Sequence, residues 1–583
     1  MMTSIVAADS LLAIDIGTVT TRALLFDVVG GSYRFIAAGI APSTAGDPFG
    51  DAGEGVRRAF NHLEEITGRM LLGSDGNLII PSRADGSGVD TFAVTLSAGP
   101  PMKAVVVGLL EDVSVDSACR LAETTYARVV EILSLNDRRK QDARIDTILR
   151  ARPDLIIMAG GVEGGASLSV RKLLEAVGLA CFLLPKGQRP QVLFAGNTAM
   201  QKEVKESLEP LAELYIAPNI RPTLEVEQLA PAQTQVAQIF KKVRSKQILS
   251  IPELDAWAKG RLIPTSMAFG RIIRFLSRIY DQSKGVLGVD VGASSTTVVA
   301  AFNGKLTAGV YPHLGLGSGL DKLLQHTNLG KITRWLPVYV PDGRVRDYLY
   351  NKAAFPASLP ATPDEMAIEQ AIARQVMRIA IQKVSGNFPQ DASGSGAGLL
   401  PWLEPVVATG SVLTHAPTPG QSLLMLLDGL QPTGVTTILL DQNDLVSALG
   451  AAADVNPLLV VQVLGSNTIL NLGAVIAPVG NARPGEPILR IRVTYEDGNE
   501  SNVEVKNGSI EVLPLPLGQT ANLRLQPLHR FDVGMGPGRG GRLQVIGGAL
   551  GVVIDARGRP LTWHPDPGRQ RSLLKKWLWT LGN

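Results

Sequence analysis

The chain has 583 residues, of which 45% are hydrophobic, 19% charged and 5% aromatic, and its formal net charge is +3. This near-neutral balance excludes the broad basic surface that general nucleic-acid binding needs, and the length predicts about three or four domains or subdomains. Two cysteines exclude a disulfide framework, and Met1–Ser10 lacks the pattern of a secretory signal, so we expect a cytoplasmic protein.

The first predicted elements form an antiparallel meander. Leu11–Gly17 and Thr20–Asp27 are apolar runs of strand length, Gly30-Gly31 is a tight turn, and a third strand is expected over Ser32–Ile40. A helix follows later, over Gly53–Thr67.

From about residue 102 to residue 194, the pattern changes to alternating strands and helices. Such alternation predicts a parallel sheet covered by helices. The expected elements are a strand over Lys103–Leu109, a helix over Asp116–Leu133, a strand over Asp154–Ala159, a helix over Ser167–Val177 and a strand over Val192–Phe194. Two further helices are expected over Glu225–Lys242 and Ala268–Tyr280.

A second meander repeats the first, with strands over Val286–Gly292, Thr296–Phe302 and Leu306–Val310. Next, Thr362-Pro363-Asp364-Glu365 carries the N-cap, first-turn proline and third-position glutamate of a helix start. A later strand, Pro405–Ala408, ends in a turn at Thr409-Gly410-Ser411.

Two C-terminal segments have alternative interpretations. Val455–Ala482 has no charged residue, but Asn, Pro and Gly interrupt it, so we favour a buried helix and strand over a membrane span. Arg569–Leu581 has an apolar helical face with basic residues beside it. This helix either docks on its own domain, which we favour, or makes peripheral contact with a membrane.

The strongest chemical signal is a repeated hairpin turn. It comprises Asp15, Gly17, Thr18, Thr20 and Thr21 in the first meander. Its second copy comprises Asp290, Gly292, Ser294, Ser295 and Thr296. Glycine lets the backbone approach a phosphate, N–H groups and hydroxyls donate to it, and the aspartate can hold Mg²⁺ through water. Because both turns lead into strands, a P-loop and a dinucleotide fingerprint, which lead into helices, do not fit. Two facing turns would clamp the tail of a nucleotide.

This pair of turns resembles the superfamily of actin, sugar kinases and heat-shock chaperone ATPases. The resemblance implies an α/β fold of two actin-like, ribonuclease H-like lobes. It also implies an adenosine-contacting turn, for which Thr409, Gly410 and Ser411 are the candidates. With the patterns above, we expect a first lobe over residues 1–100, an inserted α/β region over 101–265 that completes it, a second lobe over 266–482, and a small C-terminal β domain over 483–583.

Within the superfamily, the chain resembles the glutamate mutase accessory protein family of the MutL or GlmL type. The more specific matching segments are Arg152–Gly165, with Ala-Gly-Gly-x-Glu-Gly-Gly, and Ala217–Pro222, with Ala-Pro-Asn-x-x-Pro. The resemblance implies an ATPase that reactivates an adenosylcobalamin-dependent mutase by driving the release of damaged cobalamin. The expected cofactors are ATP and Mg²⁺, and the expected partners are the mutase subunits.

The same resemblance assigns roles to the turns. Asp15 and Asp290 would position Mg²⁺, the hydroxyls of the two hairpins would hold phosphates, and Gly410 would lie near the adenosine. The second turn departs from the family pattern, since Ala293 replaces a glycine and Thr297 an acidic residue. Ala293 restricts the backbone, so we expect weak ATPase activity, or nucleotide binding without hydrolysis.

Two other functions are compatible with the sequence. One is an actin-like structural membrane adaptor of the cell-division or pilus-assembly type, anchored by Arg569–Leu581. The other is a sugar or acetate kinase, for which we locate no substrate base between the two phosphate turns.

Overall fold

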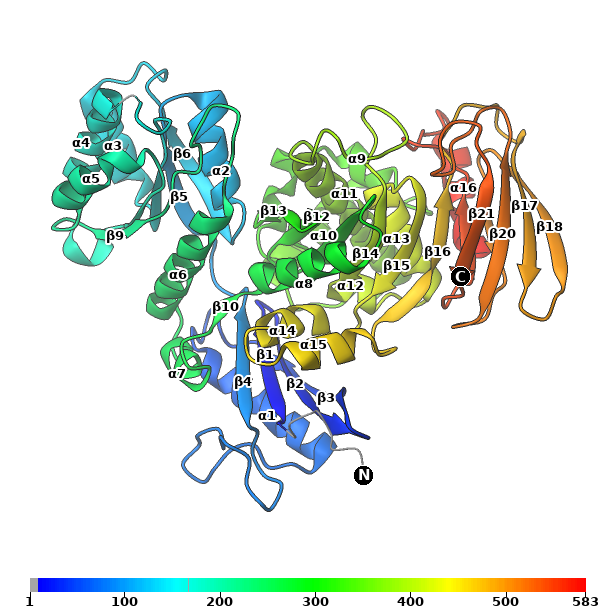
Figure 1. The fold of residues 1–583 in the computed structure, drawn as a ribbon, viewed down its shortest axis with the longest axis horizontal. Helices are drawn as coiled ribbons and strands as arrows, with labels where there is room; N and C mark the ends of the chain where they lie inside the picture. Colours follow the sequence, from blue (N-terminus) through cyan, green and yellow to red (C-terminus); the bar gives the residue numbers. More distant parts are fainter. Residues whose placement is uncertain (1–8, 166, 583) are drawn as a thin grey trace.

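The structure is a computed structural model that describes residues 9–165 and 167–582 (Figure 1). Its first sheet has the strand order β10-β4-β1-β2-β3. The strands are β1 (Leu11–Ile16), β2 (Thr20–Val29), β3 (Ser32–Pro42), β4 (Thr91–Leu96) and β10 (Ile263–Pro264). The first three form the predicted antiparallel meander, whereas β4 runs parallel to β1. Helix α1 (Ala52–Thr67) packs on this sheet and ends at Gly68, which adopts the left-handed conformation of a C-cap.

The inserted region forms a separate parallel sheet, which lies at the upper left in Figure 1. Its order is β6-β5-β7-β8-β9. The strands are β5 (Met102–Val107), β6 (Ala127–Leu133), β7 (Leu155–Met158), β8 (Gln191–Phe194) and β9 (Glu213–Ile216). The helices are α2 (Asp116–Ala122), α3 (Gln141–Ala151), α4 (Ser167–Leu183) and α5 (Gln201–Leu208). Helices α6 (Ala230–Gln247) and α7 (Ile251–Trp257) then lead the chain back to β10.

The helix predicted over Asp116–Leu133 is wrong. Helix α2 ends at Ala122, and Ala127–Leu133 is the edge strand β6, which pairs with β5. The β-branched Val129, Val130 and Ile132 favour a strand. Their spacing also fits a helix face, so pairing with β5 decides between the two structures.

The second lobe repeats the strand order of the first. Its sheet runs β13-β12-β11-β14-β15-β16-β22-β19. The strands of the lobe are β11 (Gly285–Val291), β12 (Thr296–Phe302), β13 (Lys305–Tyr311), β14 (Leu403–Thr409), β15 (Gly434–Leu440) and β16 (Leu470–Ala477). Strands β11 to β13 form the second predicted meander, and β14 runs parallel to β11. The shared order confirms a mixed α/β fold with two actin-like lobes.

Helices cover the second sheet. They are α8 (Thr265–Ile279), α9 (Leu329–Thr333), α10 (Asp342–Ala354), α11 (Pro363–Ser385), α12 (Ser411–Thr414), α13 (Pro419–Leu430), α14 (Leu445–Ala452) and α15 (Pro457–Leu464). Helix α11 begins as predicted, because the Thr362 side chain accepts a hydrogen bond from the Glu365 N–H. The charge-free segment Val455–Ala482 contains α15 and β16, and no helix of the described residues is long and apolar enough to cross a membrane.

The C-terminal residues form a small β domain but also extend the second lobe. Strands β17 (Pro487–Tyr495), β18 (Glu500–Lys506), β20 (Thr520–Pro527) and β21 (Gly541–Ile546) form a separate antiparallel sheet, at the right in Figure 1. Strands β19 (Ile510–Leu513) and β22 (Val552–Asp555) instead join the large sheet, with β22 beside β16. All four residues of β22 are buried. A division at residue 482 therefore cuts through one shared sheet.

The last helix, α16 (Pro567–Thr580), docks on the protein itself. Its apolar residues Leu574 and Trp577 are buried, as is Leu581 directly after it, and the Trp577 indole donates to the Gly508 carbonyl. Gly420 of α13 packs so closely that a Cβ there would overlap the Leu581 carbonyl oxygen. This confirms the docking interpretation.

Candidate functional site

The two predicted hairpin turns have the same backbone geometry. In the first turn, the Gly17 N–H donates to the Thr20 carbonyl at 3.0 Å, and in the second the Gly292 N–H donates to the Ser295 carbonyl at 2.9 Å. A Cβ at Gly17 would lie 2.9 Å from the Thr20 oxygen, and one at Gly292 would lie 3.2 Å from the Ser295 oxygen. Each glycine therefore permits a tight turn.

The turns face each other across one cleft of about 80 Å³. The Thr18 hydroxyl donates to the Ser294 hydroxyl at 3.0 Å, so the two lobes touch at the turns. The predicted residues that line this cleft are Asp15, Gly17, Thr18, Thr20, Asp290, Gly292, Ser294, Ser295, Gly410 and Ser411.

The other predicted residues, Thr21, Thr296 and Thr409, are buried beside the cleft and do not line it. The Thr296 hydroxyl donates to the Leu314 carbonyl at 2.6 Å, and the Thr409 hydroxyl donates to the Asp441 carbonyl at 3.0 Å. Thr296 and Thr409 thus hold neighbouring loops in place.

Gly410 needs to be glycine. Its φ is +108°, and a Cβ there would overlap the Val291 carbonyl oxygen at the end of β11. The third turn is therefore packed directly on the strand that leads into the second hairpin.

Ala293 does not strain the second hairpin. It is absent from the positive-φ residues of the described chain, so its backbone does not require glycine. The close approach comes instead from Gly315, where a Cβ would lie 2.6 Å from the Ser295 nitrogen. The other departure, Thr297, pairs in register with Asp290, as Arg22 does with Asp15.

The cleft also contains a charged pair that the sequence did not predict. Arg22 forms an ion pair with Asp444, and both residues line the cleft. Asp444 has a φ of +56°, which is uncommon outside glycine, and its carboxylate lies against the Thr409 hydroxyl. A lone arginine in an apolar strand was the available signal for Arg22, whereas nothing local distinguished Asp444 from an ordinary loop aspartate.

The predicted aspartates lie where the protonated form is favoured. Burial raises the pKa of Asp15, although the Thr95 and Thr265 hydroxyls donate to its carboxylate at 2.6 and 2.9 Å. Burial, together with the charges of Asp444 and Asp15, raises the pKa of Asp290 to about 8.

A fourth acidic side chain, Asp441, is buried in the same group. Burial and the neighbouring Asp444 raise its pKa to about 7, while its side chain accepts hydrogen bonds from the Leu445 and Val446 N–H groups. Arg22 is the cation that these carboxylates surround, and their charges raise its pKa against the opposing effect of burial.

This donor set fits Mg²⁺. Mg²⁺ prefers oxygen ligands, keeps several waters and is held by one or two carboxylates together with substrate phosphates. The described residues contain no group of three or more His, Cys, Asp or Glu that could hold a metal by themselves. Asp15 and Asp290 are the predicted residues that supply carboxylate oxygens to the cleft.

The sequence matches one protein family, and the structure has weak similarity to several solved structures. A family model described as MutL protein matches residues 11–468. Protein MutL of Clostridium tetanomorphum is 24% identical over 439 residues, which are 71% of this chain and 88% of that protein.

Among solved structures, component A of the Acidaminococcus fermentans (R)-2-hydroxyglutaryl-CoA dehydratase matches at 10% identity and a TM-score of 0.25, covering 76% of this chain and 96% of that chain. A glycerol dehydratase reactivase matches at 11% identity and a TM-score of 0.27, covering 72% and 95%.

Proposed function

The chain belongs to the MutL protein family, and on this premise we propose that it is an ATP-binding accessory protein that reactivates an adenosylcobalamin-dependent mutase of the glutamate mutase type. The observation that carries the nucleotide part is the pair of equivalent hairpins that face each other across one cleft. The mutase as partner rests on the family resemblance of the sequence.

The proposed nucleotide lies between the two hairpins. The N–H and hydroxyl groups of Thr18, Thr20 and Ser295 donate to phosphate oxygens, and Gly410 lies near the adenosine. Asp15 and Asp290 would hold Mg²⁺, which would supply positive charge against the phosphates. Because Thr18 and Ser294 already touch, a phosphate takes the place of their mutual hydrogen bond.

The proposed reactivation uses the two lobes as a nucleotide-dependent clamp. ATP contacts both hairpins at once and so stabilises one arrangement of the lobes, and its slow hydrolysis releases that arrangement. A mutase bound to the outside of the lobes experiences this motion, which loosens its hold on a damaged cobalamin.

Calorimetric titration of the full chain with MgATP tests nucleotide binding. We expect binding that weakens by at least about tenfold in Asp15→Asn and Asp290→Asn, because each loses a charge that favours Mg²⁺. Asp321→Asn is the matched control, since Asp321 is exposed and does not line the cleft. Absence of binding to the unaltered chain would refute the proposal.

The partner is tested with glutamate mutase that carries an inactivated cobalamin. The expected result is release of that cobalamin, followed by its absorbance in the filtrate, when the chain and MgATP are both present. Asp290→Asn should abolish the release. Nucleotide binding without release in this assay would retain the ATP site and overturn the mutase assignment.

A further inference from the structure

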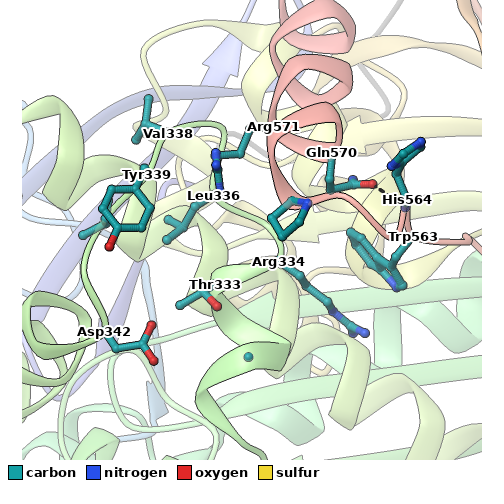
Figure 2. Close-up of a pocket in the computed structure, with 13 residues that line it drawn as sticks. Thr333, Arg334, Leu336, Val338, Tyr339, Asp342, Trp563, His564, Gln570 and Arg571 are labelled. Carbon is teal, nitrogen blue, oxygen red and sulfur yellow. Dashed lines mark hydrogen bonds between the residues drawn. The ribbon is translucent and has the colours of Figure 1, made fainter.

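A second pocket lies between the second lobe and the C-terminal helix (Figure 2). Its volume is about 270 Å³. One wall comes from α9, from the segment between α9 and α10, and from the start of α10, and the other from α16 and the loop before it. The residues that matter here are Arg334, Tyr339 and Asp342 on the first wall and Trp563, Gln570 and Arg571 on the second.

Each wall holds an arginine against an aromatic ring of the opposite wall. The Arg334 guanidinium lies 4.5 Å from the centre of the Trp563 ring, and that of Arg571 lies 5.7 Å from the centre of the Tyr339 ring. Within residues 9–165 and 167–582, neither arginine has a carboxylate partner, and the buried Arg334 Nε has no hydrogen-bond partner. The Arg571 guanidinium therefore retains capacity for an anion, whereas Arg334 already donates to the Gln375 Oε1 at 3.4 Å.

Gln570 supplies a further unused donor. The residue is 5% exposed, and its Oε1 accepts a hydrogen bond from the His564 N–H at 2.9 Å. Its Nε2 is buried and, within the described chain, has no hydrogen-bond partner. Buried donors without partners are rare in native proteins. One that lines a pocket points to an acceptor supplied from outside.

The charge around the pocket is predominantly positive. Asp342 is the acidic residue among those that line it. Behind the wall, burial lowers the pKa of Arg378, and the positive charges of Arg334 and Arg559 lower it further. Like charges gathered at one place favour the binding of an anion.

We propose that this pocket binds a small planar organic anion, in which a phosphate or carboxylate group is attached to an aromatic ring. The anionic group pairs with the Arg571 guanidinium, on the wall that Gln570 also lines. The ring stacks on Tyr339, which is 74% exposed. This site lies apart from the cleft between the lobes and does not depend on the function proposed for that cleft.

Binding there would also join two parts of the chain. The ligand contacts both the α9–α10 segment and α16, so it holds the C-terminal helix on the second lobe. Anything that binds the native state alone stabilises it, so the ligand should raise the unfolding temperature.

The test is calorimetric titration of the full chain with phenyl phosphate, benzoate, inorganic phosphate and phenol. We expect one of the two aromatic anions to bind at a single site. Phenol lacks the charge and inorganic phosphate lacks the ring, so each should bind at least about tenfold more weakly. The tighter of the two aromatic anions identifies the ligand as a phosphate or a carboxylate.

Substitutions locate the binding. Arg571→Ala should weaken it at least about tenfold, whereas Lys576→Ala, which removes the same charge from an exposed position of the same helix, should not. Gln570→Glu keeps the acceptor for His564 but replaces the free donor with a negative charge, and it should abolish binding. Equal affinity of Arg571→Ala and the unaltered chain, or no binding of either aromatic anion, would overturn the proposal.

Discussion

Thr18 of the first lobe and Ser294 of the second are hydrogen-bonded, with 3.0 Å between their hydroxyl oxygens. They lie within the two facing hairpins, so the contact couples the lobes at the cleft. A hydrogen bond of this kind contributes about 1 kcal/mol to stability.

A double-mutant cycle with Thr18→Ala and Ser294→Ala should therefore give a coupling energy of about 1 kcal/mol in urea unfolding. Thr18→Ala combined with Ser572→Ala, on the exposed side of α16, should be additive. An additive result for the first pair would show that the lobes are not coupled through this contact.

The buried Asp290 should make stability fall as the pH rises. Its pKa is about 8 in the folded protein and 3.8 when unperturbed. Its contribution is fully present below the unperturbed pKa and is lost as pH rises through about 8. Asp290→Asn should therefore gain unfolding free energy relative to the unaltered chain between pH 4 and pH 9. Urea unfolding across this range measures the difference, and Asp321→Asn should run parallel to the unaltered chain.

Titration of His313 should make the protein less stable as the pH falls, which is opposite to the effect of Asp290. Burial, Lys383 and His326 lower its pKa from 6.5 to about 4. The folded protein therefore holds fewer protons than the unfolded chain in this range, and stability is lost as pH falls from 6.5 through about 4. His313→Gln should flatten this part of the unfolding curve. Lys383→Met removes a neighbouring cation, so the pKa of His313 should move back toward 6.5 and stability should be lost over a narrower pH range. An unchanged unfolding curve in both variants would show that His313 does not cause the loss.

Three exposed arginines face one another across the C-terminal sheet. Arg492 pairs in register with Arg524, which pairs with Arg542. Like charges directly opposite each other destabilise a sheet, so Arg524→Thr should stabilise the protein by about 0.5 kcal/mol at low salt. The gain should shrink in 1 M salt, where the Debye length is about 3 Å. Arg490→Thr is the control, because Arg490 pairs with Glu504 at 3.2 Å and its loss should not stabilise.

A Cβ should destabilise the protein at position 410 but stabilise it at position 293. Gly410→Ala places a Cβ against the Val291 carbonyl at a φ of +108°, and it should destabilise by about 1–3 kcal/mol. Ala293→Gly relieves no strain. It should lower the free energy of unfolding by about 0.4–1 kcal/mol, because glycine increases the conformational entropy of the unfolded chain. A stabilising Ala293→Gly would show that this turn does need glycine.

The sequence was sufficient for the repeated meanders because each depends on local signals. Apolar runs of strand length, with Asp15-x-Gly17 and Asp290-x-Gly292 at their ends, predict hairpins wherever the rest of the chain lies. The Thr362 cap and the Gly68 end of α1 are local in the same sense. The element that was wrongly predicted, Asp116–Leu133, contains a segment whose partner strand decides its structure.

The same distinction applies to the cleft. Its hairpin residues could be predicted, but Arg22 and Asp444 are 422 residues apart and meet because β2 and the start of α14 belong to facing lobes. The environment that raises the pKa of Asp290 also comes from this meeting. Because these charges meet only when the two lobes are packed together, no pattern in the sequence indicates that they are neighbours.

Because β22 comes late in the chain, one edge of the large sheet stays open during synthesis. Strand β22 lies between β16 and β19 in the finished sheet but comes after both in sequence. While the chain emerges from the ribosome, the outer side of β16 stays unpaired until Asp555 has been synthesised. An unpaired strand edge is a template for association with other chains. The growing polypeptide therefore carries this open edge until β22 has emerged, and a premature stop before β22 leaves the edge open.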